Sequence, residues 1–240
     1  MEKSEKKTSY FSKGVKDGLP IGLGYLSVSF AFGVQSSILG VPILISLLIS
    51  ATNLTSAGQL AGLEIIARSG GFLEIILTQI VINARYFLMS ITLSQKLEDD
   101  YSLPNRLLSS AFITDEIFLV SVTKNRCVNK SYFYGLSLLP YICWTLGTLV
   151  GAILGGILPF EVQSALGIAI YAMFIAIIIP PIKESRSVLF AVLISGAISC
   201  LFYYIPLLKD SVSQGFAIII SAVISALIIA KIYPRGGADE

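Results

Sequence analysis

The sequence of 240 residues contains no histidine. Without histidine there is no His-ligated metal, no Ser-His-Asp chemistry and no histidine proton relay. The three cysteines, Cys127, Cys143 and Cys200, are widely spaced and include no C-x-x-C pair, so we interpret them as free thiols. We therefore expect neither a metal site nor a cofactor.

Motifs of common enzymes are missing as well. The sequence has no G-x-x-x-x-G-K-[ST], no H-E-x-x-H and no G-x-S-x-G, which are motifs of ATP hydrolysis, zinc proteases and serine hydrolases. Because the sequence offers no recognisable nucleophile–base pair and no set of metal ligands, we do not expect an enzyme.

Charge is scarce, since only 13% of the residues are charged and 55% are hydrophobic, whereas a typical soluble domain has about 25% charged residues. Apolar runs recur along nearly the whole chain, and many are long enough to cross a bilayer, which takes roughly 20 helical residues. The runs are continuous and do not alternate apolar with polar residues, which favours helices over a β-barrel. The sequence predicts an all-α polytopic membrane protein.

About eight apolar segments are visible, at 18–39, 41–66, 72–94, 103–123, 132–158, 164–181, 187–206 and 213–232. They define a transmembrane domain over 18–232, between polar tails at 1–17 and 233–240. The segment 103–123 carries Asp115 and Glu116 in mid-run, so it is a candidate for a broken or re-entrant element.

The basic residues indicate an orientation in the cell membrane. If the N-terminus is cytoplasmic and every segment crosses, the inner loops and tails hold thirteen Lys and Arg residues, the outer loops hold three, and Arg85 lies inside a span. Because basic residues concentrate on the cytoplasmic side, we expect both termini in the cytoplasm. This count places Lys96, Arg106 and Lys209 outside, and Arg68 and Lys130 inside.

A weak internal repeat occurs at an offset of 120 residues, where Leu19-Pro20 aligns with Leu139-Pro140. It gives candidate repeats over 18–123 and 132–232. Many transporters are built from repeats, with the substrate site between them. Chance similarity between apolar helices explains the match equally well.

Arg85 lies near the middle of the third apolar segment, where a cation normally faces protein or a water-filled cavity. Asp115 and Glu116 are adjacent and would point about 100° apart on a helix, so one can face Arg85 and the other a substrate ammonium or a proton path. Alternatively, Thr114 caps a helix start and the acids lie at its positive end. Glu74 is a third candidate partner for Arg85.

A polar run at Ser50–Gln59 interrupts the second apolar segment. Such a run can unwind, because Ser, Thr and Asn side chains offer the backbone alternative partners, and unwound backbone in a membrane must be buried or line a cavity. We pair it with a polar stripe on the segment 72–94. The candidate substrate-binding residues are Thr52, Asn53, Thr55, Ser56, Gln59, Gln79, Asn83 and Tyr86. The alternative is a helix–helix interface held by small polar residues.

Proline and glycine mark two further features. Pro20 lacks an N–H and lies among glycines, so the stretch Gly18–Tyr25 is expected to be a second irregular element. Gly147, Gly151 and Gly155 repeat the G-x-x-x-G pattern and give one helix a smooth face for close packing. The partner helix could belong to this chain or to a second, small subunit.

Several motifs occur in one order along the chain. L-P-x-x-x-G-Y is matched by Leu19 to Tyr25, Asn-Ala-Arg-Tyr by Asn83 to Tyr86, and Thr-Asp-Glu by Thr114 to Glu116. Trp144 and Gly147 also fit. Through these motifs the chain resembles, over about residues 10 to 235, the AzlC-like (azaleucine-resistance) family of branched-chain amino acid permeases. Leu60 departs from the family's Gln-Phe after the small-residue run Ser56-Ala57-Gly58.

The resemblance implies export of branched-chain or similar hydrophobic amino acids, together with a small membrane subunit of the AzlD type. The polar residues supply donors for a carboxylate and acceptors for an ammonium, and apolar walls would hold the side chain. We therefore expect the large subunit of a secondary transporter, coupled to an ion or proton gradient through Arg85, Asp115 and Glu116. Its partners would be the substrate, the small subunit and the bilayer, and no nucleic acid. The alternatives are a channel or transporter for another small solute, and a non-transporting scaffold subunit.

Overall fold

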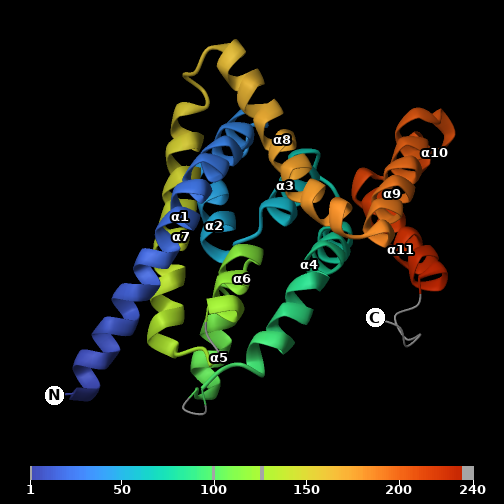
Figure 1. Cartoon of the computed structure of the whole chain (residues 1–240). Coiled ribbons are helices and arrows are strands. Elements are labelled where there is room, and N and C mark those ends of the chain that lie inside the picture. Colours follow the sequence, from blue (N-terminus) through green and yellow to red (C-terminus); the bar gives the residue numbers. More distant parts are fainter. Residues whose placement is uncertain (1, 99–100, 125–126, 234–240) are drawn as a thin grey trace. The chain divides into compact units, whose positions relative to one another are not determined.

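The computed structural model describes residues 2–98, 101–124 and 127–233, and the regular elements within them are helices (Figure 1). In chain order they are α1 (Glu2–Ile38), α2 (Ile43–Thr52), α3 (Ser56–Ala67), α4 (Phe72–Ser94), α5 (Leu103–Ser110), α6 (Asp115–Lys124), α7 (Lys130–Leu154), α8 (Phe160–Glu184), α9 (Arg186–Tyr204), α10 (Pro206–Ser211) and α11 (Gln214–Ile232). The predicted all-α class is confirmed. All but the first residue of the predicted tail 233–240 lies outside the described residues.

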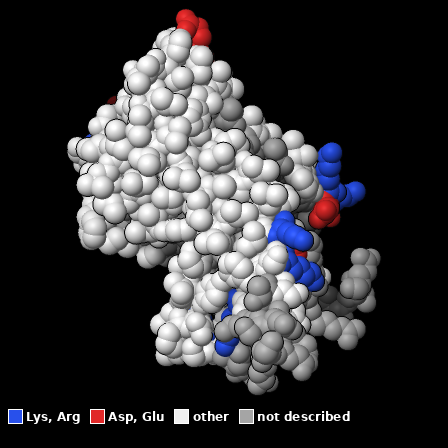
Figure 2. Space-filling model, turned by 90° about the vertical axis from the view of Figure 1, so that its left-hand side faces the viewer, with Lys and Arg blue, Asp and Glu red and all other residues white. Residues whose placement is uncertain are grey.

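Five of these helices are long and apolar enough to cross a membrane, at Ser9–Ile38, Phe72–Ser94, Lys130–Leu154, Arg186–Tyr204 and Gln214–Ile232. The predicted segment 164–181 lies within α8, which has 25 residues. One face of the molecule is largely free of charged side chains (Figure 2). These features agree with a polytopic membrane protein, whose lipid-facing surface is apolar.

The chain divides into two compact units. The first holds residues 1–60 and 83–170, and the second holds residues 61–82 and 171–240. The unit boundaries fall within α3, α4 and α8, so each of these helices contributes residues to both units.

In the first unit, α1 and α7 lie side by side and run parallel (Figure 1). A Cβ built on Gly14 would overlap the Tyr132 carbonyl oxygen, and one built on Gly151 would overlap the Phe30 carbonyl oxygen. Early residues of α1 therefore meet early residues of α7, and late residues meet late ones. Small residues are what allow helix backbones to approach so closely.

The partner of the predicted glycine face is α1 of the same chain. Cβ atoms on Gly147 and Gly155 would overlap Ser29 and Ser37 of α1. Of the two partners that the sequence left open for this face, α1 of the same chain is the one that lies against Gly147, Gly151 and Gly155.

The predicted irregular element around Pro20 is also wrong, because α1 is helical from Glu2 to Ile38 with Pro20 inside it. Proline removes one helical hydrogen bond. On both sides of Pro20, however, α1 is in backbone contact with α7, at Gly18 against Leu136 and at Gly22 against Leu139. This packing keeps α1 helical on both sides of Pro20.

The polar run breaks its helix, as predicted. α2 ends at Thr52 and α3 begins at Ser56. The Gln59 side chain donates from Nε2 to Oγ of Ser50 at 2.8 Å, so the chain reverses direction at the break. A straight continuation would carry these two side chains apart at 1.5 Å per residue.

A second hairpin is formed by α5 and α6. The Val128 N–H donates to the Lys96 carbonyl at 2.7 Å, and the Glu98 N–H donates to the Val128 carbonyl at 3.3 Å, so the segment that contains both helices begins and ends at one place. At its tip, the Thr114 hydroxyl accepts a hydrogen bond from the Ile117 N–H at 3.3 Å and caps α6. The segment 103–123 thus does not cross a membrane.

This hairpin corrects the assumption that every apolar segment crosses. That assumption put Lys96 outside and Lys130 inside, whereas Lys96 is hydrogen-bonded to Val128, two residues before Lys130. Hydropathy alone does not distinguish an apolar hairpin from an apolar crossing, because both have the same composition.

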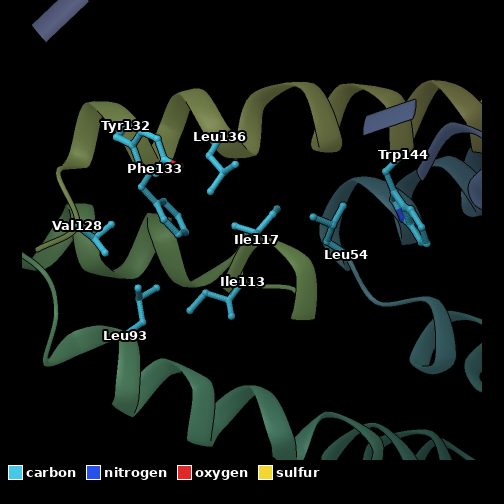
Figure 3. Packing of buried hydrophobic residues seen from close by; sticks show 9 residues of the cluster. All are labelled: Leu54, Leu93, Ile113, Ile117, Val128, Tyr132, Phe133, Leu136 and Trp144. Carbon is cyan, nitrogen blue, oxygen red and sulfur yellow. The ribbon is translucent and has the colours of Figure 1, made fainter. Parts of the chain in front are cut away.

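The core of the first unit lies between the two hairpins and α7. Leu54 comes from the first break, Ile113 and Ile117 from the second hairpin, and Phe133 and Leu136 from α7; all five side chains belong to one buried cluster. Figure 3 shows Leu54 and Ile117 pointing toward the same space beneath α7. The cluster fixes both hairpin tips close to α7.

The second unit is organised around α9, α11 and a buried carboxylate. The Ser225 hydroxyl of α11 donates to the Ala191 carbonyl of α9 at 2.7 Å. Glu74, which is 5% exposed, accepts from Arg68, from the Ser213 hydroxyl at 2.6 Å and from the Gly215 N–H at 2.8 Å. The first turn of α4 therefore lies against the start of α11.

The second unit also contradicts the assumption that every apolar segment crosses the membrane. Arg68 and Lys209 line the same cavity of about 410 Å³ in the second unit. With every segment crossing, Arg68 would lie inside and Lys209 outside. Two residues at helix ends that line one cavity cannot lie on opposite sides of the membrane.

Candidate functional site

The guanidinium of Arg85 forms an ion pair with Asp115. Their Nη1 and Oδ2 atoms are 2.9 Å apart, and each side chain is 41% exposed. The same guanidinium lies 5.0 Å from the centre of the Tyr86 ring and donates to the Tyr86 phenol oxygen at 3.2 Å. The sequence left three candidate partners for Arg85, and its partner in the first unit is Asp115.

Glu116 faces a different partner. The Tyr25 phenol donates to Oε2 of Glu116 at 2.5 Å, and its oxygen lies 2.7 Å from the Thr114 hydroxyl. The two adjacent carboxylates thus point apart, as expected for neighbours at a helix start. Asp115 is paired with a full positive charge, whereas Glu116 is held by a neutral phenol.

Glu74 is not the partner of Arg85. It belongs to the second unit, where it is paired with Arg68 and takes two further hydrogen bonds. This carboxylate is therefore structural within its unit.

The residues of the polar run fall into buried and exposed groups. Thr55 is 2% exposed and Gln59 is 1% exposed, and Ser56 is half-buried at the start of α3. Thr52 is exposed, and its hydroxyl donates back to the Leu48 carbonyl at 2.7 Å. Asn53 caps the end of α2 through its backbone N–H. Thr55 and Gln59 therefore face the interior of the unit, whereas Thr52 does not.

The predicted stripe on α4 is divided between the units. Asn83 and Tyr86 are half-buried residues of the first unit. Gln79 belongs to the second unit, where its Nε2 lies 3.2 Å from the place that a Cβ on Gly62 would occupy. Within the first unit, Tyr86 is the stripe residue in contact with the ion pair.

Two aromatic residues of the site were not among the predicted binding residues. Tyr25 of α1 binds Glu116, and Trp144 of α7 packs edge-to-face against Tyr25 with ring centres 5.1 Å apart. The sequence signals for them were a tyrosine and a tryptophan in otherwise apolar runs, which also fit ordinary core packing.

We call these residues the polar cluster. Its members are Tyr25, Thr55, Gln59, Arg85, Tyr86, Thr114, Asp115, Glu116 and Trp144, and all belong to the first unit. Most lie at the two helix breaks or on the helices that face them. The cluster offers a guanidinium, two carboxylates, hydroxyls, an amide and an indole N–H, which can bind a small polar molecule but form no nucleophile–base pair of the usual kind.

The chain is similar to membrane proteins of archaea and bacteria. A membrane protein of Archaeoglobus fulgidus is 34% identical over 202 residues, which cover 83% of this chain and 88% of the relative. The inner membrane protein YgaZ of Escherichia coli is 26% identical over 79% of this chain and 80% of its own length. A membrane protein of Helicobacter pylori is 26% identical over 74% and 79%.

No solved structure matches the chain. The family model described as AzlC protein matches residues 20–158, a range that contains α2 to α7, the second half of α1 and the whole polar cluster. The length of this match and the archaeal relative together establish that the chain is a membrane protein of the AzlC family.

Proposed function

We propose that the chain is the large subunit of a secondary transporter that exports branched-chain or other hydrophobic amino acids across the cell membrane. The observation that carries this proposal is the polar cluster, in which the ion pair of Arg85 and Asp115 lies beside two broken helices. Broken helices with polar groups at the break are the usual construction of a substrate site at membrane depth.

The hairpins support a specific topology. We propose that α1, α4, α7, α8, α9 and α11 cross the membrane, while α2–α3 and α5–α6 enter it from opposite faces and return. Both termini are then cytoplasmic. The contacts of Lys96 with Val128 and of Glu74 with Ser213 agree with this arrangement.

The basic residues favour this topology over eight crossings. The outer side then holds only Arg68 and Lys209, Arg85 stays at membrane depth, and the other fourteen of the seventeen Lys and Arg residues are cytoplasmic. Eight crossings left three basic residues outside. A stronger excess of basic residues on one side is what membrane insertion selects.

The carboxylates of Asp115 and Glu116 have different partners. Arg85 forms an ion pair with Asp115, whereas Glu116 accepts a hydrogen bond from the Tyr25 phenol. We propose that Arg85, Asp115 and Glu116 form the charge network that couples an ion or proton gradient to transport.

The substrate class, the direction and a small AzlD-like subunit rest on the family resemblance. Since α1 covers the glycine face of α7, we propose that the small subunit binds elsewhere on the chain. The polar cluster supports a zwitterionic substrate, because it combines cationic, anionic and neutral hydrogen-bonding groups.

The test is amino acid efflux from cells loaded with a leucine- or valine-containing dipeptide. Cells that express this chain with its small subunit are expected to release leucine or valine faster than cells with neither. Cells that express the chain with Arg85→Leu and Asp115→Asn serve as the inactive control. Equal efflux from all three strains would refute transport of these amino acids.

A further inference from the structure

Among the buried polar atoms of the polar cluster that have no hydrogen-bond partner within the described residues, two belong to residues of one cavity. They are Nε1 of Trp144 and Oε1 of Gln59, on side chains in residues that are 3% and 1% exposed. Buried polar groups in proteins are almost always hydrogen-bonded, and exceptions call for an explanation. Both atoms belong to residues that line one small cavity.

The cavity combines polar and apolar walls. Ser56, Gln59 and Trp144 supply polar groups, and Val28, Phe32 and Leu60 supply apolar ones. Figure 3 shows Trp144 extending from α7 toward the segment that carries Leu54. The space between these residues is too narrow for a water-sized sphere, so an ordered water in this cavity does not account for either atom.

The two side chains are held in place by other contacts. Gln59 donates from Nε2 to Ser50 at 2.8 Å, and Ser50 is hydrogen-bonded to Thr148 of α7 at 2.6 Å, which leaves Oε1 as the unused atom. Trp144 is held by its edge-to-face contact with Tyr25. The unused acceptor and the unused donor are thus fixed at one cavity.

We propose that this cavity is the closed form of the substrate subsite. The Trp144 N–H donates to the carboxylate of a hydrophobic amino acid, Gln59 Oε1 accepts from its ammonium, and Val28, Phe32 and Leu60 enclose its aliphatic side chain. This inference rests on the proposed function, which it deepens by naming the groups that bind the substrate.

The break before Ser56 provides the opening. Leu60 and Gln59 lie within the first two turns of α3, which is joined to α2 only through the non-helical residues Asn53–Thr55. A shift of α3 at this joint, with loss of the hydrogen bond from Gln59 to Ser50, widens the cavity while α1 and α7 keep their close contact. Because Trp144 touches Tyr25 and Tyr25 binds Glu116, a substrate bound at Trp144 is connected through Tyr25 to the charge network.

The chain contains a single tryptophan, so its fluorescence reports on Trp144 without any substitution. We expect L-leucine to change the emission of the purified chain in lipid nanodiscs in a saturable way. Isoamylamine lacks the carboxylate and isocaproate lacks the ammonium, so each is expected to need at least tenfold higher concentration for the same change.

Two variants test the assigned atoms. Trp144→Phe keeps a ring against Tyr25 and removes the N–H, and Gln59→Met keeps the side-chain length and removes the acceptor. Each is expected to raise the KM for L-leucine at least tenfold in proteoliposomes that contain both subunits. Gln35→Met removes an amide from α1 outside the cavity and is expected to leave KM within twofold.

The results separate this inference from the proposed function. Leucine transport with unchanged emission and unchanged KM in both variants would overturn the subsite and leave the transporter standing. If wild type neither transports L-leucine nor changes its emission, both proposals fail. If either variant does not fold, the L-leucine titration of wild-type Trp144 emission still tests the subsite.

Discussion

The guanidinium of Arg85 on α4 lies 2.9 Å from the carboxylate of Asp115 at the start of α6. One residue belongs to a long apolar helix and the other to the tip of a hairpin. A charge at membrane depth is tolerated when it meets protein or water. The hairpin brings Arg85 its counter-charge, which explains why an arginine persists in so apolar a segment.

We predict that Arg85→Leu destabilises the protein, by about 1–3 kcal/mol, because it leaves the Asp115 carboxylate without its cation. The double variant Arg85→Leu/Asp115→Asn is expected to recover most of this loss but not transport. The measurements are the fraction of monodisperse protein after a heat step and the rate of leucine efflux.

A matched control uses the neighbouring acid. Arg85→Leu/Glu116→Gln is expected to recover nothing, since Glu116 is bonded to Tyr25 and not to Arg85. Equal recovery by both double variants would show that the pairing is not specific. No recovery by either would mean that Arg85 is balanced by other groups.

Some of this site could be predicted from the sequence. The break at Asn53–Thr55 follows from local chemistry, because hydroxyl and amide side chains compete for the backbone. The pairing of Arg85 with an acid follows from the cost of an isolated charge, although the sequence left three carboxylates as candidates. Thr114 as the cap of α6 follows from its position directly before two acids.

Other features could not be predicted because they depend on long-range contacts. A break in an apolar segment does not reveal whether the chain continues or reverses. The reversal of α5–α6 follows from the hydrogen bonds that join Lys96 and Glu98 to Val128. The straight course of α1 through Pro20 depends on its contact with α7. Hydropathy scores Trp144 as a whole residue, so it does not reveal that the indole N–H is buried without a partner.

We predict that Tyr25→Phe keeps the fold and lowers transport at least tenfold. The phenyl ring still packs against Trp144, but Glu116 loses the hydrogen bond from the phenol. Efflux of leucine and thermal stability are measured on the same preparation. Thr114→Val is the comparison, because loss of the α6 cap is expected to cost about 1 kcal/mol of stability. A Tyr25→Phe protein that transports at the wild-type rate would remove Glu116–Tyr25 from the mechanism.

Glycines of the first unit give a prediction about packing. Gly151→Ala is expected to cost about 1–3 kcal/mol, because its Cβ would overlap the Phe30 carbonyl and force α1 away from α7. Gly24→Ala, where a Cβ meets nothing within 4 Å, is expected to be neutral or to stabilise α1 by up to about 1 kcal/mol. Both variants are made in the chain expressed alone, without a small subunit. Equal stability of the two variants would place the Gly151 face outside the α1–α7 contact.

The hairpin topology makes the sharpest prediction, because it assigns sides that eight crossings would not. Starting from a chain whose three cysteines are replaced, single cysteines are introduced at Gly71, Lys96 and Lys209, and the native Cys127, which is exposed, is restored in a fourth variant. In intact cells a membrane-impermeant maleimide is expected to label positions 71 and 209. Positions 96 and 127 are expected to react only after the cells are permeabilised, because the loops that carry them meet at the base of the α5–α6 hairpin. Cysteine at Lys3 serves as the cytoplasmic reference. Labelling of 96 and 127 from opposite sides would mean that α5–α6 crosses the membrane after all, and the polar cluster would then lack the hairpin tip that brings Asp115 to Arg85.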